Sequence, residues 1–218
     1  MISLVGSAEA NADTIALPSH QVNDLILIFS YNDGQTTAVS LPTGFSSVYG
    51  SVMGSFGYVL VGHKLATSTS ETSGTWTNAD HLIVLVFRGD ADTIIIPEFF
   101  VSNSATSTNV TFGTQPAGSF RTGASDVAVV GLVAQRNTTN NLAQAPGAMT
   151  HILDGGDGAN YQVAANWDDA RTSQWLSASI TVATSALYRS VVLGLFEQAF
   201  TATGGGGLLL PRGFQGGL

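Results

Sequence analysis

Four short runs of branched apolar residues constrain the fold of this chain more than any other feature. They lie within residues 23–29, 80–88, 125–133 and 189–197, and the first three contain an aspartate just before the apolar stretch: Asp24, Asp80 and Asp126. Runs of this length, rich in Val and Ile and bounded by Gly, Asn and Asp, are typical of strands buried on both faces. We therefore expect them to be the central strands of a β-sandwich.

The rest of the chain is also typical of an all-β protein. Short alternating segments and turn sequences such as Asn32-Asp33-Gly34 raise the expected number of strands to about ten, with little or no helix. This pattern favours an antiparallel β-sandwich of jelly-roll type. Asp24 and Asp80 are 56 residues apart, and Asp80 and Asp126 are 46 apart, so the runs have no fixed period and do not predict a repeat array. We expect residues 1–200 to form one domain.

The composition excludes several classes of function. The chain has no Cys, which rules out disulfides and thiolate chemistry, and its formal net charge is -8, which disfavours binding to nucleic acid. Only 10% of the residues are charged, against roughly 25% in ordinary soluble domains. Two interpretations stay open: a Ser/Thr-rich sandwich, or a surface that faces other subunits, because interface cores are depleted of charge. No apolar run is long enough for a membrane span, and the first residues do not resemble a signal peptide, so we expect assembly in a cytoplasm.

The C-terminal residues 201–218 differ from the rest of the chain. Four glycines, residues 204–207, form a flexible spacer before an apolar tip. An expression remnant and an unstructured end are two interpretations of this segment. The third, which we prefer, is an arm that inserts into a neighbouring subunit or another protein. Its anchors would be apolar residues and a proline: Leu208, Leu209, Leu210, Pro211 and Phe214.

The sequence contains no convincing catalytic or metal motif, and we expect a protein without enzymatic activity or cofactor. None of the four histidines has the spacing of a zinc motif. The best metal candidate is the segment with Asp154 and Asp157, whose carboxylates could bind Ca²⁺. However, Asp-Gly is also common turn chemistry, and a bare turn is the better interpretation.

Three tryptophans suggest an alternative function. Trp76, Trp167 and Trp175, with Asp168 beside the second, could line a groove in which aromatic rings stack on a glycan of a host surface. The structural alternative is that the tryptophans belong to the core of the sandwich. An exposed ring among the three would favour glycan binding.

Several segments taken together resemble one class of proteins. They are residues 22–29, the turn at 41–45, the stretch from Gly74 to Gly89 and residues 125–130. Their order resembles the β-sandwich virion proteins of tailed bacteriophages, of the capsid-decoration or minor-tail type. The resemblance covers most of residues 1–200, leaves out the glycine-rich tail and carries over no active site. It implies a virion structural protein that forms homo-oligomers and contacts other virion proteins, and it leaves head or tail open.

Overall fold

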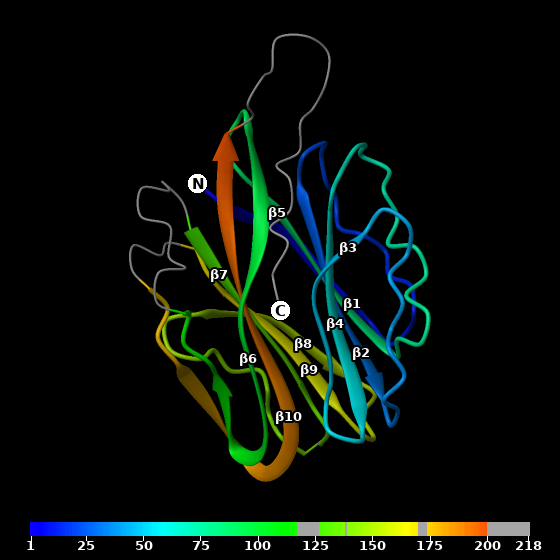
Figure 1. The fold of residues 1–218 in the computed structure, drawn as a ribbon, viewed down its shortest axis with the longest axis vertical. Helices are drawn as coiled ribbons and strands as arrows, with labels where there is room; N and C mark the ends of the chain where they lie inside the picture. The colour runs from blue at the N-terminus through cyan, green and yellow to red at the C-terminus, as the bar shows by residue number, and fades with distance from the viewer. Residues whose placement is uncertain (117–126, 138, 170–173, 200–218) are drawn as a thin grey trace, which may run out of the picture.

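The computed structural model describes residues 1–116, 127–137, 139–169 and 174–199. Within these residues the fold contains ten strands and no helix, and the strands form two five-stranded sheets (Figure 1). The first sheet has the order β1-β5-β2-β4-β3. Its strands are β1 (Ser3–Ala10), β2 (Leu25–Asp33), β3 (Ser46–Val52), β4 (Gly57–Leu65) and β5 (His81–Arg88).

The second sheet has the order β6-β10-β7-β9-β8. Its strands are β6 (Thr93–Phe112), β7 (Val127–Gln135), β8 (Thr150–Gly156), β9 (Gln162–Asp168) and β10 (Ala178–Ala199). All neighbouring strands in both sheets are antiparallel. The predicted antiparallel β-sandwich is confirmed. The jelly-roll type is not confirmed, because the first five strands make up one sheet and the last five make up the other.

The two sheets are repeats of one five-stranded unit. If five is added to each strand number of the first sheet, its order becomes that of the second sheet. The details also match, since the third strand of each unit has a register shift against the fourth, at Val48 in β3 and at Ile152 in β8. A buried tryptophan precedes the last strand of each unit, Trp76 before β5 and Trp175 before β10. The recurring apolar runs are therefore the central strands of two matched units.

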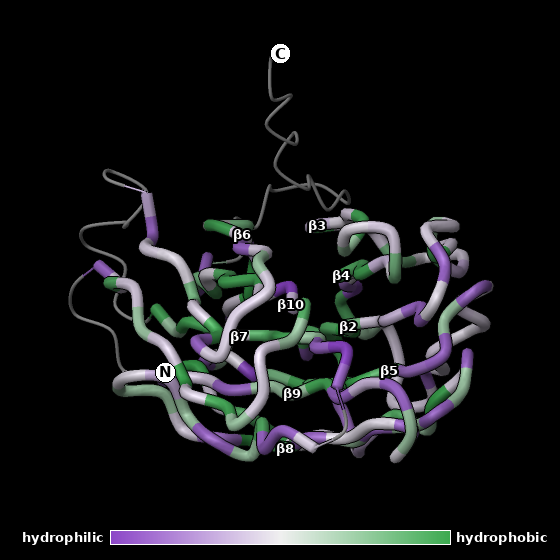
Figure 2. The backbone as a smooth tube through the Cα atoms, turned by 90° about the horizontal axis from the view of Figure 1, so that it is seen from below, coloured by the Kyte–Doolittle hydropathy of each residue, from purple (hydrophilic) through white to green (hydrophobic). Residues whose placement is uncertain are grey.

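Apolar side chains form three layers, and only the middle one joins the two sheets. The middle layer lies between the sheets and takes side chains from both, among them Phe29 of β2, Leu85 of β5 and Leu132 of β7. The other two layers lie on the outer faces, under loop segments that contain Trp76 and Trp175. Because both faces of the central strands are covered, β2, β5 and β7 are buried along nearly their whole length, and Figure 2 shows β2 and β7 as green segments inside the molecule. This explains their continuous apolar sequences.

All four edge strands are irregular. Register shifts occur in β1 near Val5, in β3 at Val48, in β6 near Phe100 and in β8 at Ile152, and β6 also contains Pro97. Bulges and prolines prevent a sheet edge from pairing with a strand of another molecule. The edges of this sandwich are thus poor sites for strand-to-strand association.

Several segments differ from what the sequence predicts. Residues 101–109, rich in Ser, Thr and Asn, are predicted to be a loop but belong to β6, because β10 supplies their backbone hydrogen bonds. Residues 75–77 are predicted to form a short strand but are not in one. Residues 175–182 and 189–197 are predicted to form two strands but belong largely to one long strand, β10, which has an irregularity between Thr181 and Ala186.

Candidate functional site

A polar hollow of about 340 Å³ lies at one end of the sandwich. It is built where β2 ends and β5 begins, and the turn between β8 and β9 completes it. Both repeat units thus contribute to it. The lining residues carry carboxylate, amide and phenol groups: Asn11, Asp33, Asp80, Asp157, Asn160 and Tyr161.

Hydrogen bonds inside the protein occupy much of this hollow. The Tyr31 hydroxyl donates to Asp33 Oδ1 over 2.8 Å, and the Asp33 backbone N–H donates to Asp80 Oδ2 over 2.7 Å. The Tyr161 hydroxyl donates to Asn11 Oδ1 over 3.2 Å. These contacts tie the end of β2 to the start of β5 and to the second sheet, and they indicate a structural role for the polar groups.

The hollow is electrostatically negative. Burial raises the pKa of the Tyr161 phenol, and four nearby carboxylates, led by Asp157 and Asp80, raise it further. Burial and the hydrogen bond to Asp33 raise the pKa of Tyr31 in the same way. Both phenols therefore stay protonated at neutral pH and act as hydrogen-bond donors. Arg136 lies beside this cluster, with its Nε 3.7 Å from Asp33 Oδ1.

A buried histidine lies behind the hollow. His81 is the first residue of β5, and its Nδ1 is 2.5 Å from Asn11 Oδ1 while its Nε2 is 3.1 Å from Glu9 Oε2. Burial lowers the pKa of His81 to about 4, and the charge of Asp157 opposes this shift. The ring is then neutral at pH 7 and has one N–H to donate. Both neighbouring oxygens are acceptors, so the single N–H can serve only one of them. Glu9 lies in β1 and Asn11 follows its last residue, so His81 packs β5 against the end of β1.

Of the predicted metal candidates, Asp157 stabilises the turn between β8 and β9, whereas Asp154 lies within β8. Asp157 Oδ1 accepts the backbone N–H groups of Ala159, Asn160 and Tyr161. Burial raises the pKa of Asp157, but these hydrogen bonds outweigh burial and bring the pKa to about 2. Asp154 Oδ1 instead contacts His151 Nε2 at 3.0 Å. The residues described contain no group of three His, Asp or Glu side chains that could hold a metal ion, and the turn interpretation describes Asp157 but not Asp154, which lies in β8.

The structure does not bring the predicted glycan-binding residues together. Trp76 is fully buried on the outer face of the first sheet, where its indole N–H donates to Ser73 O over 3.1 Å. Trp175 is 2% exposed on the outer face of the second sheet. Trp167 is partly buried and packs against the middle layer, beside Phe87, and Asp168 ends the same strand. The prediction of a tryptophan-lined groove is wrong for Trp76 and Trp175, because apolar packing retains both rings in the core.

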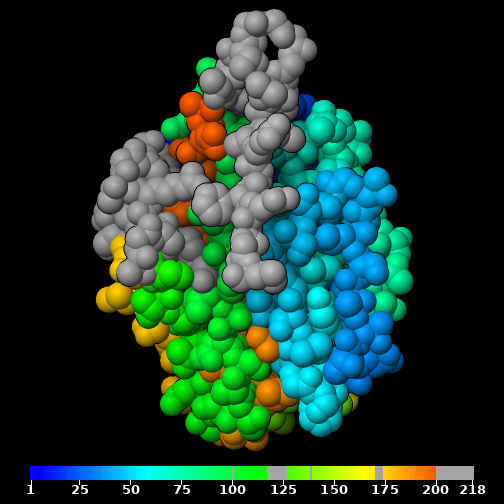
Figure 3. Space-filling view, viewed as in Figure 1, coloured from blue at the N-terminus to red at the C-terminus, as the bar shows by residue number. Residues whose placement is uncertain are grey.

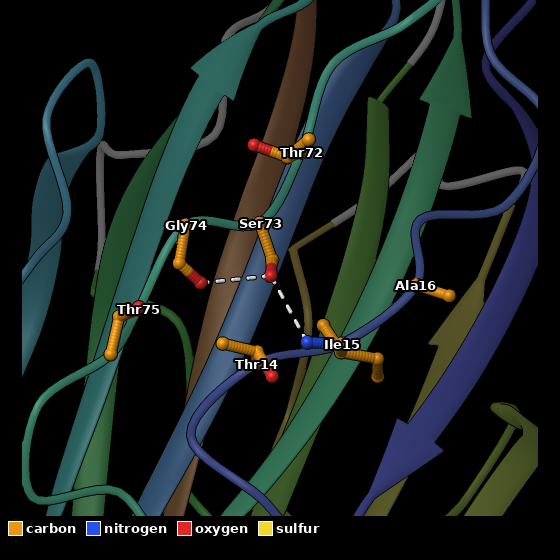
Figure 4. A pocket seen from close by; sticks show the side chains of 7 residues that line it. All are labelled: Thr14, Ile15, Ala16, Thr72, Ser73, Gly74 and Thr75. Carbon is orange, nitrogen blue, oxygen red and sulfur yellow. Dashed lines mark hydrogen bonds between the residues drawn. The ribbon is translucent and has the colours of Figure 1, made fainter.

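A second hollow lies between two loop segments that cover the outer face of the first sheet. This groove of about 390 Å³ runs between residues 14–16 and 72–75 (Figure 4). Its central hydroxyl, Ser73 Oγ, accepts the Ile15 backbone N–H over 3.0 Å and donates to Gly74 O over 2.9 Å, as the dashed lines in Figure 4 mark. The lining residues include no acid, base or histidine, so the groove offers no group for proton transfer.

One apolar surface feature lies where the edge strands β3 and β6 of the two sheets meet. We call it the seam patch and define it as Tyr49 and Phe99, whose rings stack with their centroids 4.9 Å apart. Phe99 is 42% exposed and is one of six exposed large apolar side chains among the residues described, while Tyr49 is partly buried. In the lower half of Figure 3 the blue-to-cyan surface of β3 and β4 lies beside the green surface of β6.

Sequence reasoning missed both the polar hollow and the seam patch. Asp33 and Asp80 are recognisable in the sequence as turn and strand-start residues, but only the pairing of β2 with β5 brings them together. Phe99 and Tyr49 belong to different sheets, and no spacing in the sequence relates them. The predicted arm residues, Leu208 to Leu210, Pro211 and Phe214, lie outside the residues described.

Comparisons of the chain with protein-family models, with curated proteins and with solved structures found no match. The ranges described also contain no helix long and apolar enough to cross a membrane.

Proposed function

We propose that this chain is a non-enzymatic structural component of a bacteriophage virion. It would assemble in the host cytoplasm through contacts with copies of itself and with other virion proteins, and residues 204–218 would serve as an arm. The observation that carries this proposal is the charge-poor surface, with only 10% charged residues and large apolar side chains such as Val52, Phe56 and Phe99 more than 40% exposed. Surfaces that face other subunits are depleted of charge and rich in apolar and aromatic side chains.

The hollows support a structural role over catalysis. The carboxylates of Asp33, Asp80 and Asp157 each accept hydrogen bonds from their own chain, and so does Ser73 Oγ in the second groove. A catalytic acid or base needs a polar atom that is free to reach a substrate. Here these groups stabilise turns and strand ends.

The resemblance of residues 22–29, 41–45, 74–89 and 125–130 to tailed-phage virion proteins supports the proposed location. Capsid decoration and a tail or fibre position are both consistent with it. In either place, modest contacts would be repeated by symmetry, so that weak single contacts add up to a stable assembly.

The test is mass spectrometry of virions of the encoding phage, purified through a density gradient. The proposal predicts peptides of this chain in the virion band at a constant ratio to the major capsid protein across fractions. A phage that encodes the chain without residues 204–218 is the matched comparison, and it should show a reduced ratio. Absence of the full-length chain from the virion band, with its presence in the soluble lysate, would refute the proposal.

The glycan-binding alternative gains no support from the tryptophans. Trp76 and Trp175 cannot stack on a sugar without leaving the core, and they lie on the outer faces of different sheets. Of the predicted groove residues, only Trp167 and Asp168 remain as candidates for glycan binding.

A further inference from the structure

We propose that His81 and Glu9 form a clasp at the junction of the two sheets, and that one added proton closes it. Glu9 lies in β1 and His81 is the first residue of β5, and Glu9 Oε2 is 3.1 Å from His81 Nε2. With the proton, a hydrogen bond joins these two atoms. Without it, their lone pairs repel each other.

The clasp lies against the second sheet. A methyl group at Gly155 of β8 would come within 2.7 Å of Glu9 Oε2 and 2.8 Å of His81 Cε1, so both side chains press on the backbone of β8. The ring of Tyr161, which precedes β9, lies edge-on to the His81 ring with centroids 5.9 Å apart. A change in the contact between Glu9 and His81 therefore acts on both sheets.

The other ring nitrogen of His81 fixes the position of the proton that the neutral ring carries. Asn11 Nδ2 donates to Gly156 O over 2.9 Å, so the Asn11 amide presents its Oδ1 to His81 Nδ1 and to the Tyr161 hydroxyl. An amide oxygen can only accept hydrogen bonds. Nδ1 must therefore carry the N–H, and Nε2 carries a lone pair.

The lone pair of Nε2 faces a second acceptor. Nε2 is buried without a hydrogen-bond partner, and an ionised Glu9 presents only oxygen lone pairs to it. A proton between Nε2 and Oε2 would convert this contact into a charge-assisted or neutral hydrogen bond in a buried place, where such bonds are strong. The Glu9 side chain is 40% exposed, so its carboxylate can turn towards water when the proton is absent.

The surroundings of His81 set the pH at which the clasp closes. Among the residues described, the titratable groups that face the ring are carboxyls and phenols: Glu9 from β1, Tyr31 from β2, Asp80 beside it in the chain, and Asp157 and Tyr161 from the second sheet. Burial lowers the pKa of His81 to about 4, and the charge of Asp157 opposes this shift. The clasp is then open at neutral pH and closes as the pH falls towards 4.

The first test is the titration of His81 in the folded protein, followed by NMR of the histidine ring atoms. The His81 signals are identified by their nuclear Overhauser effect to the Tyr161 ring. We expect the Nδ1–H tautomer at pH 7 and a midpoint near pH 4, and the backbone amide of Gly155 should shift with the same midpoint. An Nε2–H tautomer at pH 7, or a Gly155 amide that does not follow His81, would overturn the inference.

Glu9→Gln separates the clasp from an isolated histidine. Its amide can donate to Nε2 without an added proton, and the carboxylate that attracts the proton is gone, so the His81 midpoint should fall by about one pH unit or more. Asp92→Asn is the matched control, because it also removes one exposed carboxylate, but at the opposite end of β5. This control should keep the wild-type midpoint. Equal midpoints in Glu9→Gln and the wild-type chain would refute the clasp.

Thermal unfolding at pH 7 gives a second readout that needs no acid. Glu9→Gln holds the clasp closed at this pH, so it should melt about 2–4 °C above Asp92→Asn, the shift that one added buried hydrogen bond produces in a domain of this size. The comparison with Asp92→Asn removes the general effect of one fewer negative charge. If Glu9→Gln melts no higher than Asp92→Asn, the contact between Glu9 and His81 does not join the sheets and the inference fails.

Discussion

Replacing Trp76 by alanine should strongly destabilise the protein. Trp76 is fully buried, its ring lies edge-on to Phe45 with centroids 5.2 Å apart, and its N–H bonds Ser73 O. A buried tryptophan removes about 150–250 Å² from water, worth about 4–6 kcal/mol at 25 cal/mol per Å². The edge-on pair adds about 1 kcal/mol. Partial collapse of the cavity offsets part of this sum, and we expect a loss of about 3–5 kcal/mol in the free energy of unfolding.

Urea unfolding followed by circular dichroism measures this loss. In a domain of about 200 residues it should also lower the melting temperature by roughly 6–20 °C. Trp175→Ala should cost a similar amount, because Trp175 has the matching place in the second unit and donates to Gly113 O over 3.1 Å. Trp167→Ala is the control and should cost less, since that ring is partly exposed. A loss below about 1 kcal/mol for Trp76→Ala would refute the reasoning that the ring supports the outer face of the first sheet.

Three further predictions concern the charged groups and one glycine. Asp24 is buried and accepts two hydrogen bonds from Arg88. Arg88→Met should therefore lower the free energy of unfolding, measured in urea, by about 1–3 kcal/mol. The double variant Arg88→Met/Asp24→Asn should recover part of this loss. The hydrogen bond from Lys64, with others from Thr67, lowers the pKa of Glu71 from 4.5 to about 2. The Glu71 carboxylate therefore contributes its full share to the free energy of unfolding above pH 4.5, and this share is lost as the pH falls towards 2. Glu71→Gln should therefore flatten the melting temperature against pH in that window, and an unchanged slope would refute the assignment. Gly62→Ala would place a methyl group 2.5 Å from Leu41 Cδ2 and 2.8 Å from the ring of Trp76, and we expect a loss of about 1–3 kcal/mol in the free energy of unfolding, measured by thermal unfolding, that Leu41→Ala partly relieves.

The central strands could be predicted from the sequence because they are buried on both faces. The runs within residues 23–29, 80–88 and 125–133 are predicted as central strands and are found as β2, β5 and β7, whose ends differ from those of the runs by at most four residues. Such strands carry a continuous apolar run of Val, Ile, Leu and Phe, with Ala and Gly added in β7, and few other structures need such a run. The edge strand β6 could not be predicted in the same way, because its residues 101–109 are polar and its pairing with β10 alone makes them a strand.

The repeat and the candidate surfaces needed the structure. The intervals between Asp24, Asp80 and Asp126 hide the repeat, because the three aspartates precede strands that do not correspond. Asp24 and Asp126 precede the second strand of their units, β2 and β7, whereas Asp80 precedes β5, the fifth strand of the first unit. The tryptophans could be recognised as important, but their burial depends on loops that cover the outer faces. The seam patch joins residues of both sheets, and its apolar side chains look ordinary in the sequence.

Two-probe unfolding tests most directly the central claim that one shared layer between the sheets unites the two repeat units. One variant keeps only Trp76 as a fluorescent tryptophan, and another keeps only Trp175, with phenylalanine at the other two positions. In each variant the fluorescence of one unit and the circular dichroism of both should report a single transition at the same urea concentration. Two transitions by circular dichroism, with the tryptophan signal following only one of them, would contradict the claim.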